Sequence, residues 1–376
     1  MFWRLTIATQ GETAIRPTQI FWGAAVSSSF QPIDPLQDSR WSEFLHGHPR
    51  ASIFHSPEWL EALRQTYGYE PVVLTTSRPG EPLQDGVAAC KVKSWLVRPR
   101  LVSLPFSDHA EPLVSDQENL LRLLAFLEKG TEEGKWRSVE LRPPCAGQSF
   151  ANWSQFQDGQ QFVLHSLNLQ PSLANLFRGL NKDSTQRKIR KAVREGLKYE
   201  EGRSEEQLRK FFRLLIMTRR RNSLPPPPFA WFQNVLHCLG EHAKIRIATT
   251  RKGELAGAVF SLRYKETMLF KYGASDARFH SLGTMPFLLW QAIEEAKYSG
   301  AAQFDFGRSG MENKGLINFK HHFGANQSVL IHKVFPAMSW EAGRNSGSLV
   351  CAKKVFSILP DRALVLAGKL IYPHIG

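Results

Sequence analysis

Cysteine is scarce in this sequence. Its 376 residues contain four cysteines, and these lie far apart in the chain, at Cys90, Cys145, Cys238 and Cys351. No pair has the C-x-x-C spacing of a zinc site, and nothing in the spacing indicates a disulfide scaffold. We therefore expect reduced thiols, as in cytosolic proteins, and no metal site.

Long apolar runs are also missing. No stretch approaches the roughly 20 apolar residues that a membrane-spanning helix needs. The N-terminal segment, residues 1–30, has short apolar pieces broken by polar residues such as Arg4 and Glu12, so it lacks the continuous core of a signal peptide. The expected location is the cytoplasm, unless another feature holds the chain at the inner face of a membrane.

Acidic residues are outnumbered by basic ones. The chain has 48 Lys and Arg against 34 Asp and Glu, a net charge of +14. This balance favours an anionic partner, which could be a nucleic acid, an anionic lipid surface or a phosphate-bearing ligand. Basic residues gather at two predicted helices. One helix contains Arg187, Arg190 and Lys191, and the other is followed by Arg219 and Arg220. Each group suits either a solvated helix face or a strip that contacts phosphates.

An internal repeat of a mixed α/β unit is the most informative feature. Residues 245–324 read as a strand, a turn, two more strands, a helix from Pro286 to Tyr298 and a strand at 304–307. Residues 71–142 follow the same order in a degraded form. Only the second copy carries a dense run of polar residues, so we expect the working site there and mostly scaffold in the first copy.

The repeat predicts the fold class. We expect an α/β (α+β) protein of two tandem modules, each a mixed β-sheet flanked by helices, with a short C-terminal helical tail. The predicted divisions are an N-terminal extension over residues 1–33, a first module over 34–170, a second module over 171–335 and the tail over 336–376.

Two segments lie outside the repeated pattern. Pro225 to Pro228 form a run of prolines, which predicts a stiff polyproline II segment, serving as a linker, an SH3-type ligand or a rigid loop beside the site. The tail predicts apolar helices over 349–359 and 363–372 that carry Lys353, Lys354, Arg362 and Lys369. Such helices suit either a membrane interface or packing on the body of the protein.

Two places in the second copy are candidates for chemistry. The loop from Asp276 to Thr284 joins a predicted strand to a predicted helix, and N–H groups at a helix N-terminus can bind a phosphate. His321 and His322 could supply a base near neutral pH. The sequence predicts them on a strand, where adjacent side chains point to opposite faces, so at most one would face the site.

Several ordered motifs resemble one family. Residues 278–284 resemble the Gln/Arg-x-x-Gly-x-Gly/Ala pattern of the GNAT superfamily of acyl-coenzyme A transferases, with Ser281 for the first Gly and Thr284 for the last small residue. FDFGRSGMENKGLINFKHHFG, residues 304–324, resembles the signature of the FemAB-like acyltransferases within that superfamily. The basic helix at 187–197 and the arginine–proline segment at 218–232 are similar to that family as well.

The resemblance implies roles for individual residues. Asp305 would position the acceptor amine, the alternative being a structural carboxylate. Lys320 would place a cation near the acyl carbonyl or a phosphate, where it can stabilise an oxyanion. We therefore predict Asp305 and Lys320 as catalytic residues. The predicted donor-binding residues are Arg278, Ser281, Gly283 and Thr284. The predicted substrate-binding residues are Arg187, Arg190, Lys191, Arg219, Arg220 and Arg308.

The resemblance also implies an activity. The expected enzyme is an N-acyltransferase that moves an acyl group from acyl-coenzyme A, a cosubstrate rather than a tightly bound cofactor, to an amine on an amino sugar or on a cell-envelope or exopolysaccharide precursor. Two alternatives stay open: an aminoacyl-tRNA-dependent transferase of the peptidoglycan type, and a binding protein that keeps the fold without catalysis. The expected partners are the phosphate-bearing donor, the amine-bearing precursor and an anionic membrane surface, and no DNA.

Overall fold

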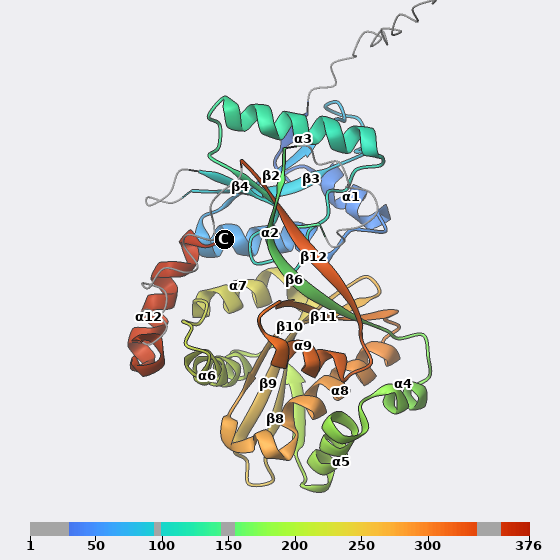
Figure 1. The fold of residues 1–376 in the computed structure, drawn as a ribbon, viewed down its shortest axis with the longest axis vertical. Coiled ribbons are helices and arrows are strands. Elements are labelled where there is room, and N and C mark those ends of the chain that lie inside the picture. The colour runs from blue at the N-terminus through green and yellow to red at the C-terminus, as the bar shows by residue number, and fades with distance from the viewer. Residues whose placement is uncertain (1–29, 94–98, 144–154, 337–354) are drawn as a thin grey trace, which may run out of the picture.

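The computed structural model describes residues 30–93, 99–143, 155–336 and 355–376. Within these ranges the strands form one mixed sheet in the order β1-β2-β3-β4-β5-β12-β6-β11-β10-β9-β8-β7 (Figure 1). The strands of the first half are β1 (Gln31–Ile33), β2 (Glu70–Thr75), β3 (Val87–Val92), β4 (Arg100–Val102), β5 (Val139–Leu141) and β6 (Gln157–Asn168). Those of the second half are β7 (Lys198–Gly202), β8 (Ala243–Thr249), β9 (Leu255–Tyr264), β10 (Thr267–Ser275), β11 (Gln303–Gly310) and β12 (Asn326–Phe335).

Helices flank this sheet in both halves. The first half contributes α1 (Ser39–Gly47), α2 (Pro57–Tyr67) and α3 (Gln117–Glu132). The rest of the described chain contributes α4 (Leu173–Gly179), α5 (Arg187–Arg194), α6 (Glu205–Arg221), α7 (Phe229–Leu239), α8 (Thr284–Tyr298), α9 (Lys314–His321) and α12 (Asp361–Ile371).

The predicted repeat is confirmed, together with the mixed α/β class. Each half contains one parallel strand pair joined through a helix: β4 and β5 through α3, and β10 and β11 through α8. The neighbouring pairs in each half are antiparallel, as β2–β3 and β9–β10 illustrate. Sequence patterns missed β4, which has three residues and is too short to show an alternation.

The two halves exchange strands where they meet. β6, from the end of the first half, pairs with β11 of the second half, and β12 pairs with both β6 and β5. Figure 1 shows β6 and β12 running together between the upper and lower halves. The sheet is therefore continuous from one half to the other, and the module boundary at residue 170 stays a prediction.

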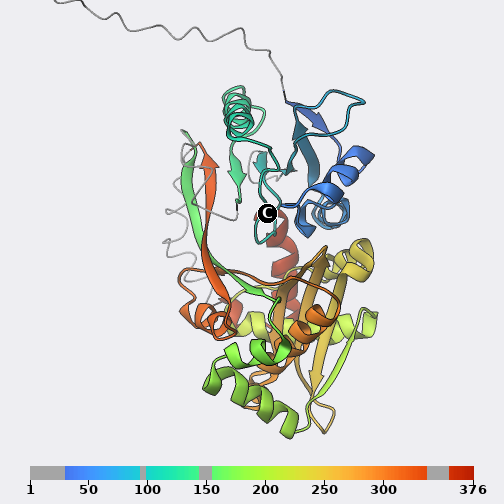
Figure 2. The same cartoon turned by 90° about the vertical axis from the view of Figure 1, so that its right-hand side faces the viewer.

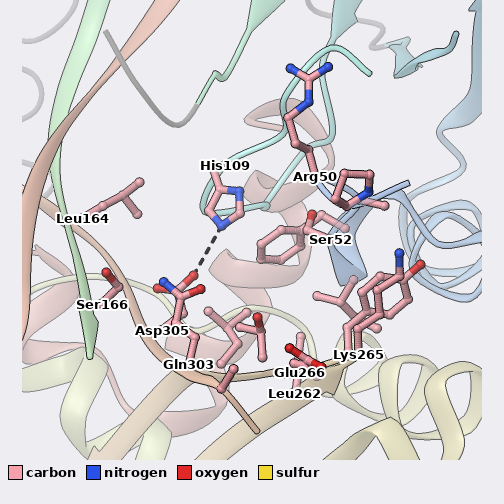
Figure 3. A pocket seen from close by; sticks show the side chains of 18 of the residues that line it. Arg50, Ser52, His109, Leu164, Ser166, Leu262, Lys265, Glu266, Gln303 and Asp305 are labelled. Carbon is pink, nitrogen blue, oxygen red and sulfur yellow. Dashed lines mark hydrogen bonds and ion pairs between the residues drawn. The ribbon is translucent and has the colours of Figure 1, made fainter. Parts of the chain in front are cut away.

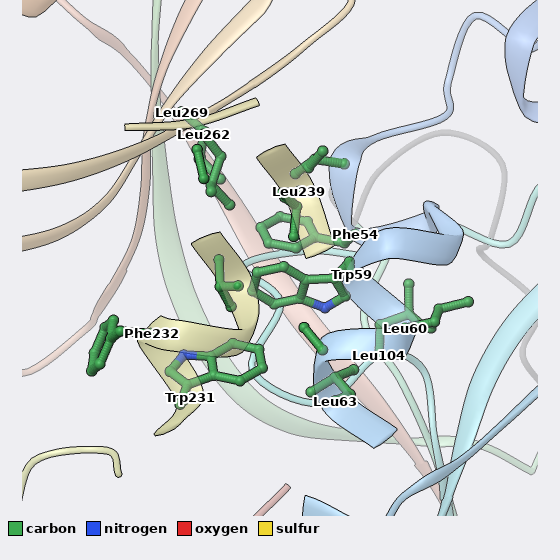
Figure 4. Close-up of a cluster of buried hydrophobic side chains, with 14 of the residues drawn as sticks. Phe54, Trp59, Leu60, Leu63, Leu104, Trp231, Phe232, Leu239, Leu262 and Leu269 are labelled. Carbon is green, nitrogen blue, oxygen red and sulfur yellow. The ribbon is translucent and has the colours of Figure 1, made fainter. Parts of the chain in front are cut away.

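A shared hydrophobic core holds the halves together on one side of the sheet. Trp59 on α2 and Trp231 on α7 are buried with their ring centroids 5.0 Å apart, edge to face. Figure 4 shows these two rings among leucines from both halves. Burying two indoles removes several hundred square ångströms of surface from water, so this contact favours a fixed arrangement of the halves.

The C-terminal helix also packs on both halves (Figure 2). The hydroxyl of Tyr69 donates hydrogen bonds to the carbonyls of Tyr372 and Pro373, at 3.2 and 3.1 Å. The Tyr372 hydroxyl in turn donates to the Pro225 carbonyl at 3.4 Å. The proline run therefore supports the tail, and the predicted helix over 363–372 is confirmed; the one over 349–359 lies largely outside the described residues. In the described ranges, no helix has both the length and the apolar character to cross a membrane.

Candidate active site

The site begins where two parallel strands separate. β10 and β11 pair over only three positions, from Thr267 opposite Gln303 to Leu269 opposite Asp305. Each strand then bulges, β10 between Phe270 and Tyr272 and β11 between Asp305 and Arg308, and the two diverge. We call the diverging segments 270–275 and 306–310 the fork. Extended backbone in the fork lacks a neighbouring strand on its inner side, so a ligand can occupy that gap.

Two cavities flank the start of the fork. One, of about 650 Å³, lies between the diverging strands and is lined by Phe270, Phe306 and the first turn of α8; we call it the fork cavity. The other, of about 710 Å³, is lined by Leu269, Asp305 and residues of the first half; we call it the cleft. Because successive side chains of a strand point to opposite faces, Asp305 lies on the other face of β11 from Phe306.

Consecutive residues line the two cavities at three places. Asp108 lines the fork cavity and His109 the cleft; the same holds for Phe270 and Leu269, and for Phe306 and Asp305. The two cavities therefore adjoin the same short stretches of backbone at residues 108–109, 269–270 and 305–306.

A buried ion pair holds the fork open. Lys271 Nζ donates to Asp108 Oδ2 at 2.8 Å and to the Phe106 carbonyl at 2.7 Å. Burial acts to raise the pKa of Asp108, but the charges of Lys271 and Arg308 outweigh it and hold that pKa below its usual range. Burial lowers the pKa of Lys271. The first half thus inserts a carboxylate between strands of the second half.

Gly307 makes room for this carboxylate. Its φ is +69°, and a Cβ there would lie 3.3 Å from the Asp108 carboxyl group. The same backbone turn lets the Gly307 N–H donate to Asp305 Oδ1 at 2.7 Å. A positive φ is costly for residues other than glycine, so this position explains the Asp-Phe-Gly order in the sequence.

Positive side chains dominate the fork cavity. Lys320, from α9, is buried and donates to the carbonyls of Gly307 and Arg308 at 2.9 and 3.0 Å. Burial lowers the pKa of Lys320 to about 8, and that of Arg308 to about 10. Arg219 and Lys188 also line this cavity. Its cations exceed the one carboxylate of Asp108, which gives it a positive potential that favours anions.

A histidine–aspartate pair occupies the cleft. His109 Nε2 lies 3.3 Å from Asp305 Oδ2 (Figure 3). Burial acts to lower the pKa of His109, but the hydrogen bond and charge of Asp305 outweigh it, so this pKa is raised. With Asp305 accepting from Nε2, the neutral imidazole carries its lone pair on Nδ1, where it can take a proton.

A second histidine in the cleft has no hydrogen-bonding partner. His165, on β6, is buried, and neither ring nitrogen finds a donor or acceptor among the described residues. Burial lowers the pKa of His165 to about 4, so its ring is neutral at pH 7. A buried polar group without a partner is unfavourable unless a ligand or water satisfies it, which makes His165 a candidate acceptor contact.

None of the four predicted donor-loop residues lines the fork cavity, although their neighbours His280, Met285 and Pro286 do. Part of the predicted loop forms a short 3-10 helix (Ala277–Leu282) before α8. Arg278 pairs with Asp276 at 2.8 Å and lines a different surface depression. Ser281 is exposed, and the Thr284 hydroxyl donates to the Phe279 carbonyl at 3.1 Å. Gly283 is required by packing, because a Cβ there would lie 2.4 Å from the Lys188 carbonyl oxygen.

The residues of the two predicted basic strips lie in different environments. Arg187 and Arg190 are exposed on α5, where Arg190 stacks on Phe177 with 5.2 Å to the ring centroid, and Lys191 is half-buried. Arg219 reaches the fork cavity, whereas Arg220 forms a salt bridge with Asp361 of α12. The structure therefore brings together Arg219, Arg308 and Lys320, places Asp305 on the adjoining face, and leaves the other predicted residues outside both cavities.

The predicted strand over His321 and His322 is wrong. These residues end α9, whose first turn is capped by the Asn313 side chain accepting from the Leu316 N–H at 3.1 Å. The helix ends before Gly324, which has a φ of +73°. His322 Nδ1 lies 2.8 Å from the Ser184 hydroxyl, a contact outside both cavities. Residues 307–318 include the end of β11 and the start of α9.

Sequence reasoning missed Asp108, His109 and Lys271. Asp108 and His109 lie in the first half, between β4 and α3, at the place that matches the loop before α8 in the second half. The available signal was two adjacent titratable residues in the apolar context LPFSDHAEP, residues 104–112. The first half is therefore more than scaffold, because it contributes side chains to both cavities.

The ion pair of the fork gives a stability prediction. Asp108→Asn leaves the buried Lys271 ammonium without a countercharge, which we expect to cost about 3–5 kcal/mol. Lys271→Met in the same chain removes that charge, so the double variant should be more stable than Asp108→Asn alone. Urea unfolding measures all three; a double variant that loses the sum of the two single losses would show that the groups do not interact.

Comparisons with known proteins agree with this geometry. Residues 182–320 match the family model described as acetyltransferase (GNAT) domain. Comparison with curated proteins gave no match. Among solved structures, FemX is 14% identical, with 84% of this chain and 99% of that chain covered and a TM-score of 0.64.

Two further solved structures share the fold. A tandem GNAT protein from the clavulanic acid biosynthesis pathway is 13% identical, with 83% and 99% covered and a TM-score of 0.53. The C-terminal domain of a putative lysylphosphatidylglycerol synthetase from Agrobacterium fabrum is 13% identical, with 85% and 96% covered and a TM-score of 0.52. At these identities the likeness concerns the fold alone. Residues 182–320 thus match a GNAT acetyltransferase domain, and the chain as a whole has a fold similar to those of FemX and the tandem GNAT protein.

Proposed function

We propose that this protein transfers an acyl group from acyl-coenzyme A to an amine, with the donor in the fork cavity and the acceptor in the cleft. The observation that carries the proposal is that consecutive residues line the two cavities at 108–109, 269–270 and 305–306. The pairing of β10 with β11 ends at Leu269 and Asp305, so a thioester in one cavity and an amine in the other would meet in the gap that opens there. Holding two reactants in contact supplies much of the rate in direct transfer.

The fork cavity suits a donor with phosphates. Lys320 and Arg308 line its inner part, and Arg219 and Lys188 come from helices α6 and α5 beside it. The first turn of α8 also lines it through Met285 and Pro286, and a helix N-terminus favours negative charge. Coenzyme A fits this chemistry, because an extended pantetheine arm can lie along the separated strands while its phosphates contact these cations.

The cleft suits the acceptor and its proton. His109 Nδ1 accepts a proton from the attacking amine, while Asp305 holds the ring through Nε2 and stabilises the imidazolium that forms. Asp305 is itself oriented by the Gly307 N–H at 2.7 Å. In this role the predicted carboxylate acts through the histidine rather than on the acceptor directly.

The transfer proceeds by direct attack. The amine nitrogen forms a bond to the thioester carbonyl carbon, the C–S bond breaks, and coenzyme A leaves as a thiolate that takes up a proton. The amine proton goes to His109 and then to solvent. A cation near the reacting carbonyl stabilises the negative charge of the intermediate, and the Lys320 ammonium in the fork is the candidate.

The polar residues in the lining of the cleft support one class of acceptor. Ser52, Ser166 and Gln303 offer hydroxyl and amide groups (Figure 3). The cleft is also lined by His165, whose ring has no hydrogen-bonding partner among the described residues. Hydrogen-bonding groups of this kind suit a hydroxyl-rich acceptor, such as an amino sugar or another cell-envelope or exopolysaccharide precursor.

One observation favours aminoacyl-tRNA as an alternative donor. Arg187 and Arg190 are exposed on α5, the helix that also carries Lys188 into the lining of the fork cavity. An exposed basic helix beside the fork cavity could contact the phosphates of an RNA. The affinity for the RNA would then fall steeply as the salt concentration rises.

The donor assignment predicts the effect of Lys320→Met. Calorimetry with coenzyme A should show at least tenfold weaker binding than wild type, because a buried cation is lost from the fork cavity. Lys314→Met is the matched control, since Lys314 lies on the same helix but is exposed. Equal affinity in both variants would remove Lys320 from the donor site. Tight binding of aminoacyl-tRNA without binding of coenzyme A would favour the alternative, and binding of either ligand without turnover would indicate a binding protein.

The base assignment predicts a pH dependence. Turnover, followed as thiol release from acetyl-coenzyme A with a panel of amino sugars, should rise with pH as His109 loses its proton. Asp305→Asn removes the partner that raises the His109 pKa, so the acidic limb should move to lower pH while the rate falls about 100-fold. His109→Gln should lose the limb altogether, whereas exposed His242→Gln should behave as wild type. If His109→Gln retains half of the wild-type rate, the base assignment is wrong.

A further inference from the structure

Exposed apolar side chains concentrate in the C-terminal segment. Of the ten large hydrophobic side chains that are exposed among the described residues, five lie within 355–376. They are Val355, Ile358, Leu366, Leu370 and Ile375, with exposed fractions from 47% to 80%. Single exposed apolar residues are ordinary, but such a concentration in one short segment makes it a candidate interaction surface.

Helix α12 presents two opposite stripes. Leu364, Gly368 and Tyr372 repeat every four residues and are buried against the body. Gly368 approaches so closely that a Cβ there would lie 2.0 Å from the Pro226 carbonyl oxygen. One side of the helix therefore packs on the body, and the opposite stripe is not covered by any of the residues that the structure describes.

The exposed stripe combines leucines with cations. Arg362, Leu366, Lys369 and Leu370 are all exposed and recur at spacings of three or four residues, so they share one face. The nearest carboxylate on this helix, Asp361, is already paired with Arg220. The face is thus positive as well as apolar, in a chain with a net charge of +14.

We propose that this face of α12 rests on an anionic lipid surface. Leucine side chains enter the boundary between headgroups and acyl chains, while Arg362 and Lys369 extend toward lipid phosphates. A protein partner is disfavoured because the stripe is narrow and flanked by long cations rather than set in a groove. The buried stripe keeps the helix attached to the body, so lipid contact requires no unfolding.

Helix α12 is connected to residues that line the fork cavity. Arg219 lines the fork cavity, and the next residue, Arg220, pairs with Asp361 of α12. Leu224 also lines this cavity and precedes the proline run, which contacts α12 at Gly368. A protein bound through α12 would hold this side of the fork cavity near the lipid surface. Lipid contact through α12 is independent of which donor or acceptor the protein uses.

Vesicle sedimentation with the full chain tests this proposal. Wild type should sediment with phosphatidylcholine vesicles containing phosphatidylglycerol and remain in solution with phosphatidylcholine alone. Leu366→Ser/Leu370→Ser should reduce the bound fraction at least tenfold with an unchanged melting temperature, because both leucines face solvent. Arg362→Gln/Lys369→Gln should reduce the salt dependence of binding.

Matched controls keep the test decisive. Leu121→Ser removes an exposed leucine on α3, and Lys198→Gln/Lys252→Gln removes two exposed cations away from α12; both should bind vesicles as wild type does. Wild type that fails to bind anionic vesicles at low salt, or a leucine double variant that binds unchanged, would overturn the proposal. A wild-type dimer in light scattering that becomes a monomer in the leucine variant would assign the face to a second copy instead.

Discussion

The ion pair between Asp108 and Lys271 is the contact on which the site depends. It places a carboxylate from the first half between two strands of the second half, at the point where β10 and β11 lose their pairing. Gly307 leaves space for it, and the same turn of backbone orients Asp305. A buried pair of this kind has little value for stability in itself, but it fixes one arrangement of the halves because either partner alone would be an uncompensated buried charge.

This arrangement explains why two modules form a single site. The residue after Asp108 is His109, which reaches the cleft and contacts Asp305 of β11. Strand exchange through β6 and β12, and the core around Trp59 and Trp231, keep the halves from moving apart. The donor side is supplied mainly by the second half and the base by the first, so neither half alone would hold the chemistry that we propose.

The sequence could predict local structure and the residues that a family motif marks. Strand alternation and helical periodicity identified the repeat, and the motif from Phe304 to Gly324 located Asp305, Arg308 and Lys320. The sequence could not predict the roles of Asp108 and His109. These roles depend on contacts with β10 and β11, which lie about 160 and 200 residues away in the chain. The strand predicted at His321 was wrong. A helix forms there because the Asn313 cap and the helical spacing of Ile317 and Lys320 outweigh the β-propensity of a short aromatic-rich run.

A crystal structure with a non-hydrolysable acyl-coenzyme A analogue would show directly whether the donor lies in the fork cavity. We predict that the pantetheine arm lies between residues 270–275 and 306–310, with phosphates near Arg219 and Lys188 and the acyl carbonyl at the start of the fork, beside Asp305. The cleft should remain free for the acceptor. An analogue bound instead in the cleft, or in the depression beside Arg278, would contradict the assignment of the two cavities.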